Sequence, residues 1–207
     1  MNVFLEKTLK LKRCPHCSVD NPNLIVVNEK IQTQADNGHN PRNWGVYKCA
    51  RCGGIVTAET NYNSNEVVNI YPKPKTVNEI LPTKVKAFLQ QAIDSVYAPA
   101  GSIMLCASAV DAMFKEKGYT EGSLYSRIDK ASNDHLITSE MAKWAHQVRL
   151  EANDQRHSDI DAELPTIEEA KQAIEFTETL SEFLFVLPSK VTRGIKATAT
   201  SKSTDSP

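Results

Sequence analysis

The sequence of 207 residues has no long apolar run. Its longest stretch without a charged residue, Ser95–Val110, has 16 residues and contains a proline and a glycine. A membrane-spanning helix needs roughly 20 apolar residues. A secretory leader is not expected either, because Glu6 and Lys7 interrupt the first apolar residues. The sequence therefore predicts a cytoplasmic protein with no membrane segment.

Motifs of several enzyme classes are also missing. The sequence has no Gly-rich phosphate loop, no nucleophile elbow and no pair of metal-binding histidines. Aromatic residues make up only 7% of the chain, and they do not cluster with basic residues along the sequence as in single-strand-binding proteins. Hydrophobic residues at 41% and charged residues at 24% are ordinary for a globular protein, so the chain has enough residues for one domain and a small appendage.

Charge is unevenly distributed along the chain. Residues 1–75 carry 10 Lys and Arg against 6 Asp and Glu, residues 76–188 carry 10 against 18, and residues 189–207 carry 4 against 1. An acidic surface repels the phosphate backbone of nucleic acids. Any nucleic acid is therefore expected at the basic ends of the chain or at a local basic patch.

Four of the five cysteines form two pairs with two residues between their members, Cys14 with Cys17 and Cys49 with Cys52. Two such turns present four thiolates tetrahedrally to one metal ion, and reducing cytosol disfavours disulfides. The pattern predicts a structural zinc site, with iron as the alternative metal. His16 is expected to be a surface residue of its turn, and Cys106 a small core residue in an apolar helix.

The residues around the cysteines favour a small sheet. Strand-like runs at 24–27, 44–48 and 55–58 are separated by turn-forming residues. Two metal-binding turns joined by a small antiparallel sheet form a zinc ribbon, which we predict for residues 1–71. The two prolines of 72–74 indicate a stiff linker, placed at 72–80.

Beyond the linker the apolar residues recur with helical spacing. We predict helices at about 83–97, from Ile103 to a Gly118 cap, around Leu124 and Ile128, from Thr138 or Ser139 onward, and from a Thr166–Glu169 capping box to Pro188. The fold class is therefore mainly α: a zinc ribbon followed by a helical bundle of about five helices at 81–188. The basic tail 189–207, rich in Ser, Thr and Lys, is expected to be disordered.

One polar segment carries candidate functional residues. If the fourth helix continues through it, Arg149, Asn153 and His157 are four residues apart and share one face. The three side chains are suited to binding a phosphate, with Arg as charge clamp, Asn as orienting amide and His as a general acid or base. The alternative is a structural network that closes the bundle.

Three segments resemble a known family, the bacterial domain of unknown function numbered 4145. They are Ile70-Tyr71-Pro72, Leu81-Pro82 and Met141–His157, in which Arg149, Asn153 and His157 match the family's Arg, Gly-Asn and His signature. Ala152 replaces the usual glycine of the signature. Ala107 and Ser108 occupy the region where the family commonly has an arginine before an acidic residue.

The resemblance implies a fold and several functions. The family is related to the HEPN helical domains, which often form homodimers, and some of which cleave RNA without a metal by means of an Arg and a His. It occurs in toxin–antitoxin, restriction and phage-defence settings. Arg149 and His157 are eight residues apart, about 12 Å along a helix at roughly 1.5 Å per residue, farther than the nuclease pattern usually allows.

Three functions follow as expectations. The first is a non-catalytic zinc-binding, HEPN-like protein that binds a partner protein or nucleic acid in a bacterial or phage defence system. The second is a metal-independent endoribonuclease whose site, made of Arg149, Asn153 and His157, spans a homodimer. The third is a structural assembly subunit.

Overall fold

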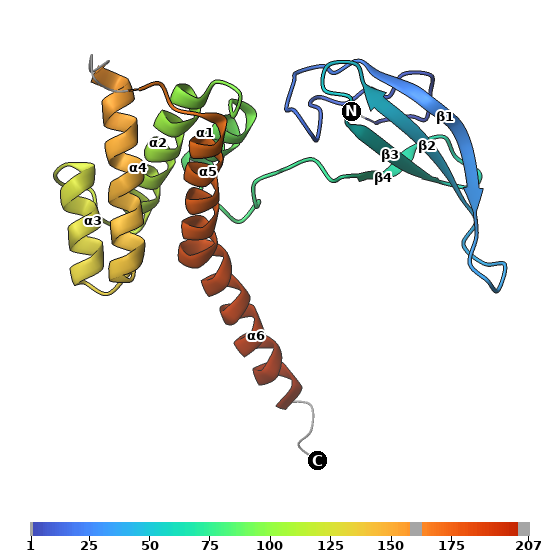
Figure 1. The fold of residues 1–207 in the computed structure, drawn as a ribbon. Helices are drawn as coiled ribbons and strands as arrows, with labels where there is room; N and C mark the ends of the chain where they lie inside the picture. Colours follow the sequence, from blue (N-terminus) through green and yellow to red (C-terminus); the bar gives the residue numbers. More distant parts are fainter. Residues whose placement is uncertain (1, 158–162, 203–207) are drawn as a thin grey trace. The chain divides into compact units, whose positions relative to one another are not determined.

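The computed structural model describes residues 2–157 and 163–202 of the chain. The chain divides into two compact units, Met1–Thr76 and Val77–Pro207. The division falls between residues 72 and 80, where the sequence predicts a linker. Figure 1 shows a sheet in the first unit and helices in the second.

The first unit contains a four-stranded antiparallel sheet in which each strand pairs with the next along the chain. The strands are β1 (Leu24–Thr33), β2 (Arg42–Cys49), β3 (Ile55–Asn61) and β4 (Val67–Tyr71). The small antiparallel sheet expected from three strand-like runs is confirmed. The fourth strand was not predicted, because β4 has no buried residue and gives no clear alternation of apolar and polar residues.

The N-terminal segment packs against one face of this sheet, which we call the inner face. The segment first pairs with the edge of β1, where the amide of Leu9 donates to the carbonyl of Leu24 and the amide of Val26 donates to the carbonyl of Lys7. It covers the face that carries Tyr47, whose hydroxyl donates to the carbonyl of Glu6. The core of the unit is small; its buried residues are Leu9, Leu11, Cys14, Cys17, Leu24, Tyr47, Cys49, Val56 and Ala58. Three of them are cysteines of the predicted metal site.

The second unit is helical, as predicted. Its elements are α1 (Thr83–Asp94), α2 (Pro99–Glu116), α3 (Leu124–Asn133), α4 (Ser139–His157), α5 (Ile167–Ser181), the π-helix η1 (Glu182–Val186) and α6 (Leu187–Lys202). The described chain thus has a mainly helical fold with a β-sheet at its N-terminal end.

Helix termini follow the local sequence signals. Gly118 lies two residues after α2 with φ +94°, a left-handed conformation that glycine adopts without strain. At the start of α5 the hydroxyl of Thr166 accepts from the amide of Glu169, and the carboxylate of Glu169 accepts from the amide of Thr166. The predicted cap and capping box are both confirmed.

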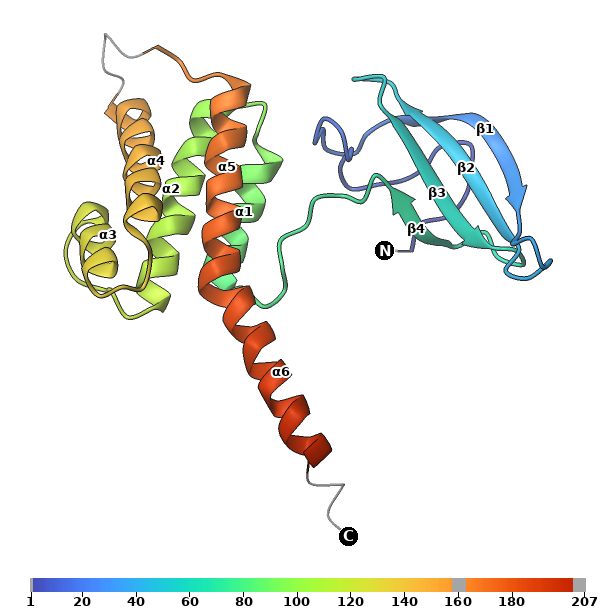
Figure 2. The same cartoon turned by 60° about the horizontal axis from the view of Figure 1, so that its bottom comes forward.

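The end of the fifth helix differs from the prediction. Instead of stopping at Pro188 and giving way to disorder, the chain continues as a helix through Lys202 (Figure 2). The π-turn explains the continuation, since the amide of Leu187 donates to the carbonyl of Glu182, five residues earlier. The wider turn accommodates a proline that lacks an amide hydrogen and would clash with the preceding turn of a regular helix.

The apolar stripe of α2 belongs to the core of the second unit. Ile103, Val110 and Phe114 are at most 1% exposed, and Ala107 is partly buried against them. An apolar stripe on a helix can form either ordinary core or a surface for self-association. Because its large side chains are already covered within the chain, it supplies no such surface.

Candidate functional site

Two similar turns position the four cysteines of the first unit. The amide of Ser18 donates to the carbonyl of Cys14, and the amide of Gly53 donates to the carbonyl of Cys49. Ser18 and Gly53, which each follow the second cysteine of a pair, have positive φ angles of 52° and 75°. The repeated geometry turns both sulfurs of each pair toward the other pair.

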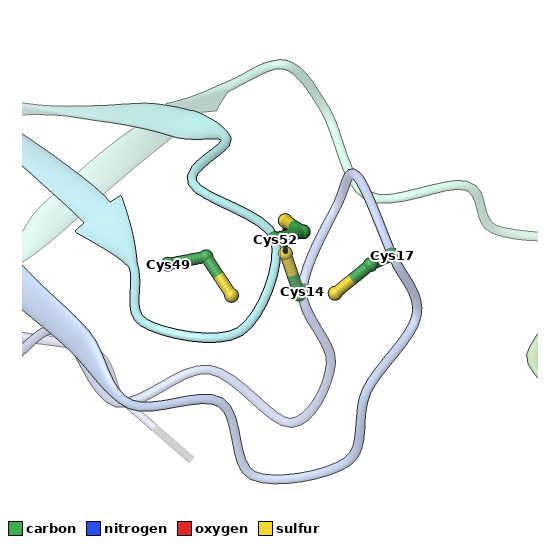
Figure 3. Close-up of side chains that lie close together, drawn as sticks. All are labelled: Cys14, Cys17, Cys49 and Cys52. Atoms are coloured by element: carbon green, nitrogen blue, oxygen red, sulfur yellow. Dashed lines mark hydrogen bonds between the residues drawn. The ribbon is translucent and has the colours of Figure 1, made fainter.

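The sulfur atoms form a compact cluster (Figure 3). All four lie within 4.8 Å of one another, and those of Cys14 and Cys52 are 4.0 Å apart. Four sulfurs bound tetrahedrally at about 2.3 Å from a zinc ion lie about 3.8 Å from one another. The predicted cluster is confirmed, and its spacing suits a metal ion such as zinc.

The surroundings of the sulfurs shift the pKa values of the thiols in opposite directions. The amide of Gly54 donates to the sulfur of Cys52 at 3.4 Å. Burial raises the pKa of the Cys17 thiol to about 12. Burial also raises the pKa of Cys49, but hydrogen bonds with the backbone of Cys52 and Arg51 and with the side chains of Cys14 and Cys52 together outweigh it and lower this pKa to about 7. A divalent cation at the centre would hold all four sulfurs as thiolates.

Two further residues considered in the sequence, His16 and Cys106, lie outside the sulfur cluster. His16 is exposed, and its Nε2 donates to the carbonyl of Ile55 at 2.7 Å, so that nitrogen has no lone pair for a metal. Cys106 is fully buried in α2, as the sequence predicts, and burial raises the pKa of its thiol to about 12.

The second unit has an open groove of about 1090 Å³ that contains two of the three candidate polar residues, Arg149 and Asn153. Helices α1 to α4 contribute to its walls. Its charged residues are Lys84, Lys115, Arg127 and Arg149 against Asp111 and Glu116. The groove is thus a locally basic surface in a segment, residues 76–188, whose net charge is −8.

Arg149 lies over an aromatic ring. Its guanidinium carbon is 5.3 Å from the ring centre of Tyr125, a residue that is 52% exposed. The Nε atom of Arg149 is buried without a hydrogen-bond partner. In the part of the chain that the structure describes, no carboxylate forms an ion pair with Arg149. Its charge is therefore available to an anionic ligand.

The three candidate residues have different outcomes. α4 continues through all of them, which confirms the helix on which their shared face depends. Arg149 and Asn153 both line the groove, and within residues 2–157 no hydrogen bond joins them. The side chain of His157, the last residue of α4, lies outside the described residues, so its role stays a prediction.

Sequence reasoning missed the residues that support Arg149. The ring of Tyr125 contacts the imidazole of His146, with centres 4.7 Å apart, and His146 Nε2 is 2.9 Å from the carboxylate of Asp129. These residues come from α3 and α4, which pack against each other. No local sequence signal marks them, because the contacts depend on how two helices pack.

A second arginine of the groove is neutralised within the protein. Arg127 pairs with Asp111 and donates to the carbonyls of Gly122 and Thr120, and its side chain is only 10% exposed. Lys115 also pairs with Asp111. Arg127 therefore holds the loop before α3 in place. Of the two arginines that line the described groove, Arg149 is the one whose charge has no carboxylate partner.

Comparisons with known proteins give one family. The sequence model of the family described as Domain of unknown function (DUF4145) matches residues 83–198, more than half of the chain. No curated protein and no solved structure matches the chain. Within the described ranges, no helix has the length and apolar character needed to cross a membrane.

Proposed function

The chain belongs to the DUF4145 family, and from that premise we propose that it is a non-catalytic, zinc-containing binding protein with a HEPN-like helical unit. Its ligand is a strand of nucleic acid held in the groove of the helical unit. The observation that carries this proposal is Arg149, which has no ion-pair partner among the described residues and lies over the exposed Tyr125 ring in a basic groove. A guanidinium suits phosphate, and an aromatic ring suits an unpaired base.

Zinc has a structural role in this proposal. Cys14, Cys17, Cys49 and Cys52 would fill all four positions of a tetrahedral ion, so no position stays open for a substrate. The ion would hold the two turns together and thereby position the sheet. Zinc is favoured over iron as the common metal of such sites, and elemental analysis of the purified protein distinguishes the two.

Two residues of the groove support a non-catalytic role. Ala107 and Ser108 lie in its wall, in the region where the family resemblance leads us to expect an arginine. The hydroxyl of Ser108 donates to the carbonyl of Met104 in its own helix. The groove therefore has fewer cationic groups to stabilise charge on an attacked phosphate.

A binding assay tests the proposal. The Kd for a labelled single-stranded RNA should rise in Arg149→Ala, and the slope of log Kd against log salt should fall by about 1, since one phosphate contact is lost. Lys143→Ala is the matched control, because Lys143 is an exposed cation of the same helix, α4, and does not line the groove. Equal loss in both variants, or no loss in either, would contradict binding in the groove.

The endoribonuclease hypothesis is tested in the same preparation. RNA incubated with the protein and EDTA should stay intact if the protein only binds. Metal-independent cleavage that disappears in His157→Ala, with the melting temperature unchanged, would replace the non-catalytic proposal with an enzyme.

Two further parts of the proposal rest on the family resemblance. We expect a homodimer, which light scattering at micromolar concentration would detect as twice the chain mass. We also expect a role in bacterial or phage defence, which neighbouring toxin, antitoxin or restriction genes would support. A monomeric mass would remove any site shared between two chains.

A further inference from the structure

The outer face of the sheet in the first unit, opposite the N-terminal segment, is unusually apolar for an exposed surface. Along β2 buried residues alternate with less buried ones, and the register of β2 with β1 and β3 extends the two faces across the sheet. On the outer face several large side chains are 39–46% exposed: Ile25, Ile31, Ile55 and Tyr71. Contiguous exposed apolar side chains commonly mark a binding surface.

Two aromatic rings lie together on this face. Trp44 of β2 and Tyr71 of β4 have ring centres 6.0 Å apart and planes inclined at 38°. Trp44 Nε1 donates to the hydroxyl of Thr33 at 2.8 Å, and the Tyr71 hydroxyl is 3.5 Å from a carboxylate oxygen of Glu59. These contacts fix the polar edges of both rings in place.

The charge of this face favours an anionic partner. Glu59 is the acidic residue beside the rings, but its side chain is 8% exposed and pairs with Arg42 at 3.3 Å. Asn69 also donates to its carboxylate. Lys48 lies between Ile25 and Ile55 in one cross-strand row of the sheet.

We infer that this outer face binds single-stranded nucleic acid, with bases stacking on Trp44 and Tyr71. Every base has a π-face that stacks on an aromatic ring, and a basic surface attracts the phosphate backbone. The apolar side chains around the rings, Ile31 and Ile55, would contact the unstacked faces of neighbouring bases. The inference concerns a surface distinct from the groove of the proposed function and stands independently of it.

The two tryptophans of the chain allow a direct test, because one lies in each unit. In Trp144→Phe the emission reports Trp44 alone. Titration with a 12-residue oligodeoxythymidylate should quench this emission, and added salt should weaken the binding. Tyr71→Ala in the same background should raise the Kd by roughly 5- to 150-fold, while Tyr71→Phe should retain binding, since it keeps the ring.

The controls separate this surface from the groove. In Trp44→Phe the remaining emission comes from Trp144, which contacts the ring of Phe176 and does not line the groove, so the oligonucleotide should leave it unchanged. Quenching of Trp44 should persist in Arg149→Ala. If Trp44 is not quenched while RNA still binds through Arg149, the inference fails and the proposed function stands.

A second copy of the chain is the competing occupant. If light scattering shows a dimer in which Trp44 resists both acrylamide and oligonucleotide, the face is covered by protein and the inference is overturned. Zinc content and circular dichroism equal to those of the unmodified protein establish that each variant is folded.

Discussion

Substituting Cys49 with serine replaces one of the four clustered sulfurs and should unfold the first unit while the second stays folded. Cys49 ends β2, and its backbone also closes the second cysteine turn through bonds with Gly53 and Gly54. Serine preserves that backbone but leaves three thiolates for the metal. The substitution should therefore act by releasing the metal, with little direct effect on side-chain packing.

The size of the core sets the expected magnitude. Apart from the cysteines, the core of the first unit contains six buried apolar residues among those that the structure describes, each contributing at most about 1.5–3 kcal/mol. Ordering a chain of this length costs far more than that core returns, and domains this small usually depend on a metal or disulfides. A structural zinc ion contributes about 10–16 kcal/mol, comparable with the whole stability of a domain. Without it the unit should have no net stability.

The assay uses the same single-tryptophan background, Trp144→Phe. In this protein Cys49→Ser should shift the Trp44 emission to the wavelength of a solvated indole, and EDTA should produce the same shift without the substitution. The helical signal in circular dichroism should persist, since the second unit has its own core.

The matched control is Cys106→Ala, which removes the cysteine outside the cluster and should leave about one zinc per chain. The reasoning is refuted if metal-free protein, by elemental analysis, keeps the emission and the amide exchange protection of a folded sheet. It is equally refuted if zinc stays bound in Cys49→Ser with its affinity unchanged.

Two predictions concern the helical core. Phe114→Ala should lower the free energy of unfolding of the second unit by about 3–5 kcal/mol, because Phe114 is fully buried. Phe183→Ala is the control: its side chain is 39% exposed, so the loss measured in the same thermal melt should be much smaller. Burial raises the pKa of Cys106 from 9.0 to about 12, so above about pH 9 its thiol stays protonated in the folded protein but ionises in the unfolded one. The free energy of unfolding should therefore fall with rising pH, by up to about 1.4 kcal/mol per pH unit. Cys106→Ala should show a shallower dependence on pH.

Local signals in the sequence predicted much of the fold. The turns at Cys14–Cys17 and Cys49–Cys52, the cap at Gly118 and the capping box at Thr166 each depend on residues within about five positions of one another. Interactions of such short range are encoded by residue type and spacing alone. The same holds for the periodicity of the core helices.

The end of the fifth helix shows where a local rule failed. Pro188 predicts a stop, because a regular helix has no room for its ring. The five-residue π-turn before it changes the hydrogen-bond register, and α6 follows. No residue type specifies a π-turn by itself, so the sequence pattern did not contain this outcome.

By itself, then, the sequence determined the cysteine cluster, the division into a sheet and a set of helices, and the helix that carries Arg149 and Asn153. Only the tertiary structure decided what those residues face. Trp44 and Tyr71 are 27 residues apart in the chain and meet because β2 and β4 flank β3. Arg149 meets Tyr125 because α4 packs on α3. Contacts between separate elements depend on strand register and helix packing, which arise from the whole core, so composition and spacing do not specify them.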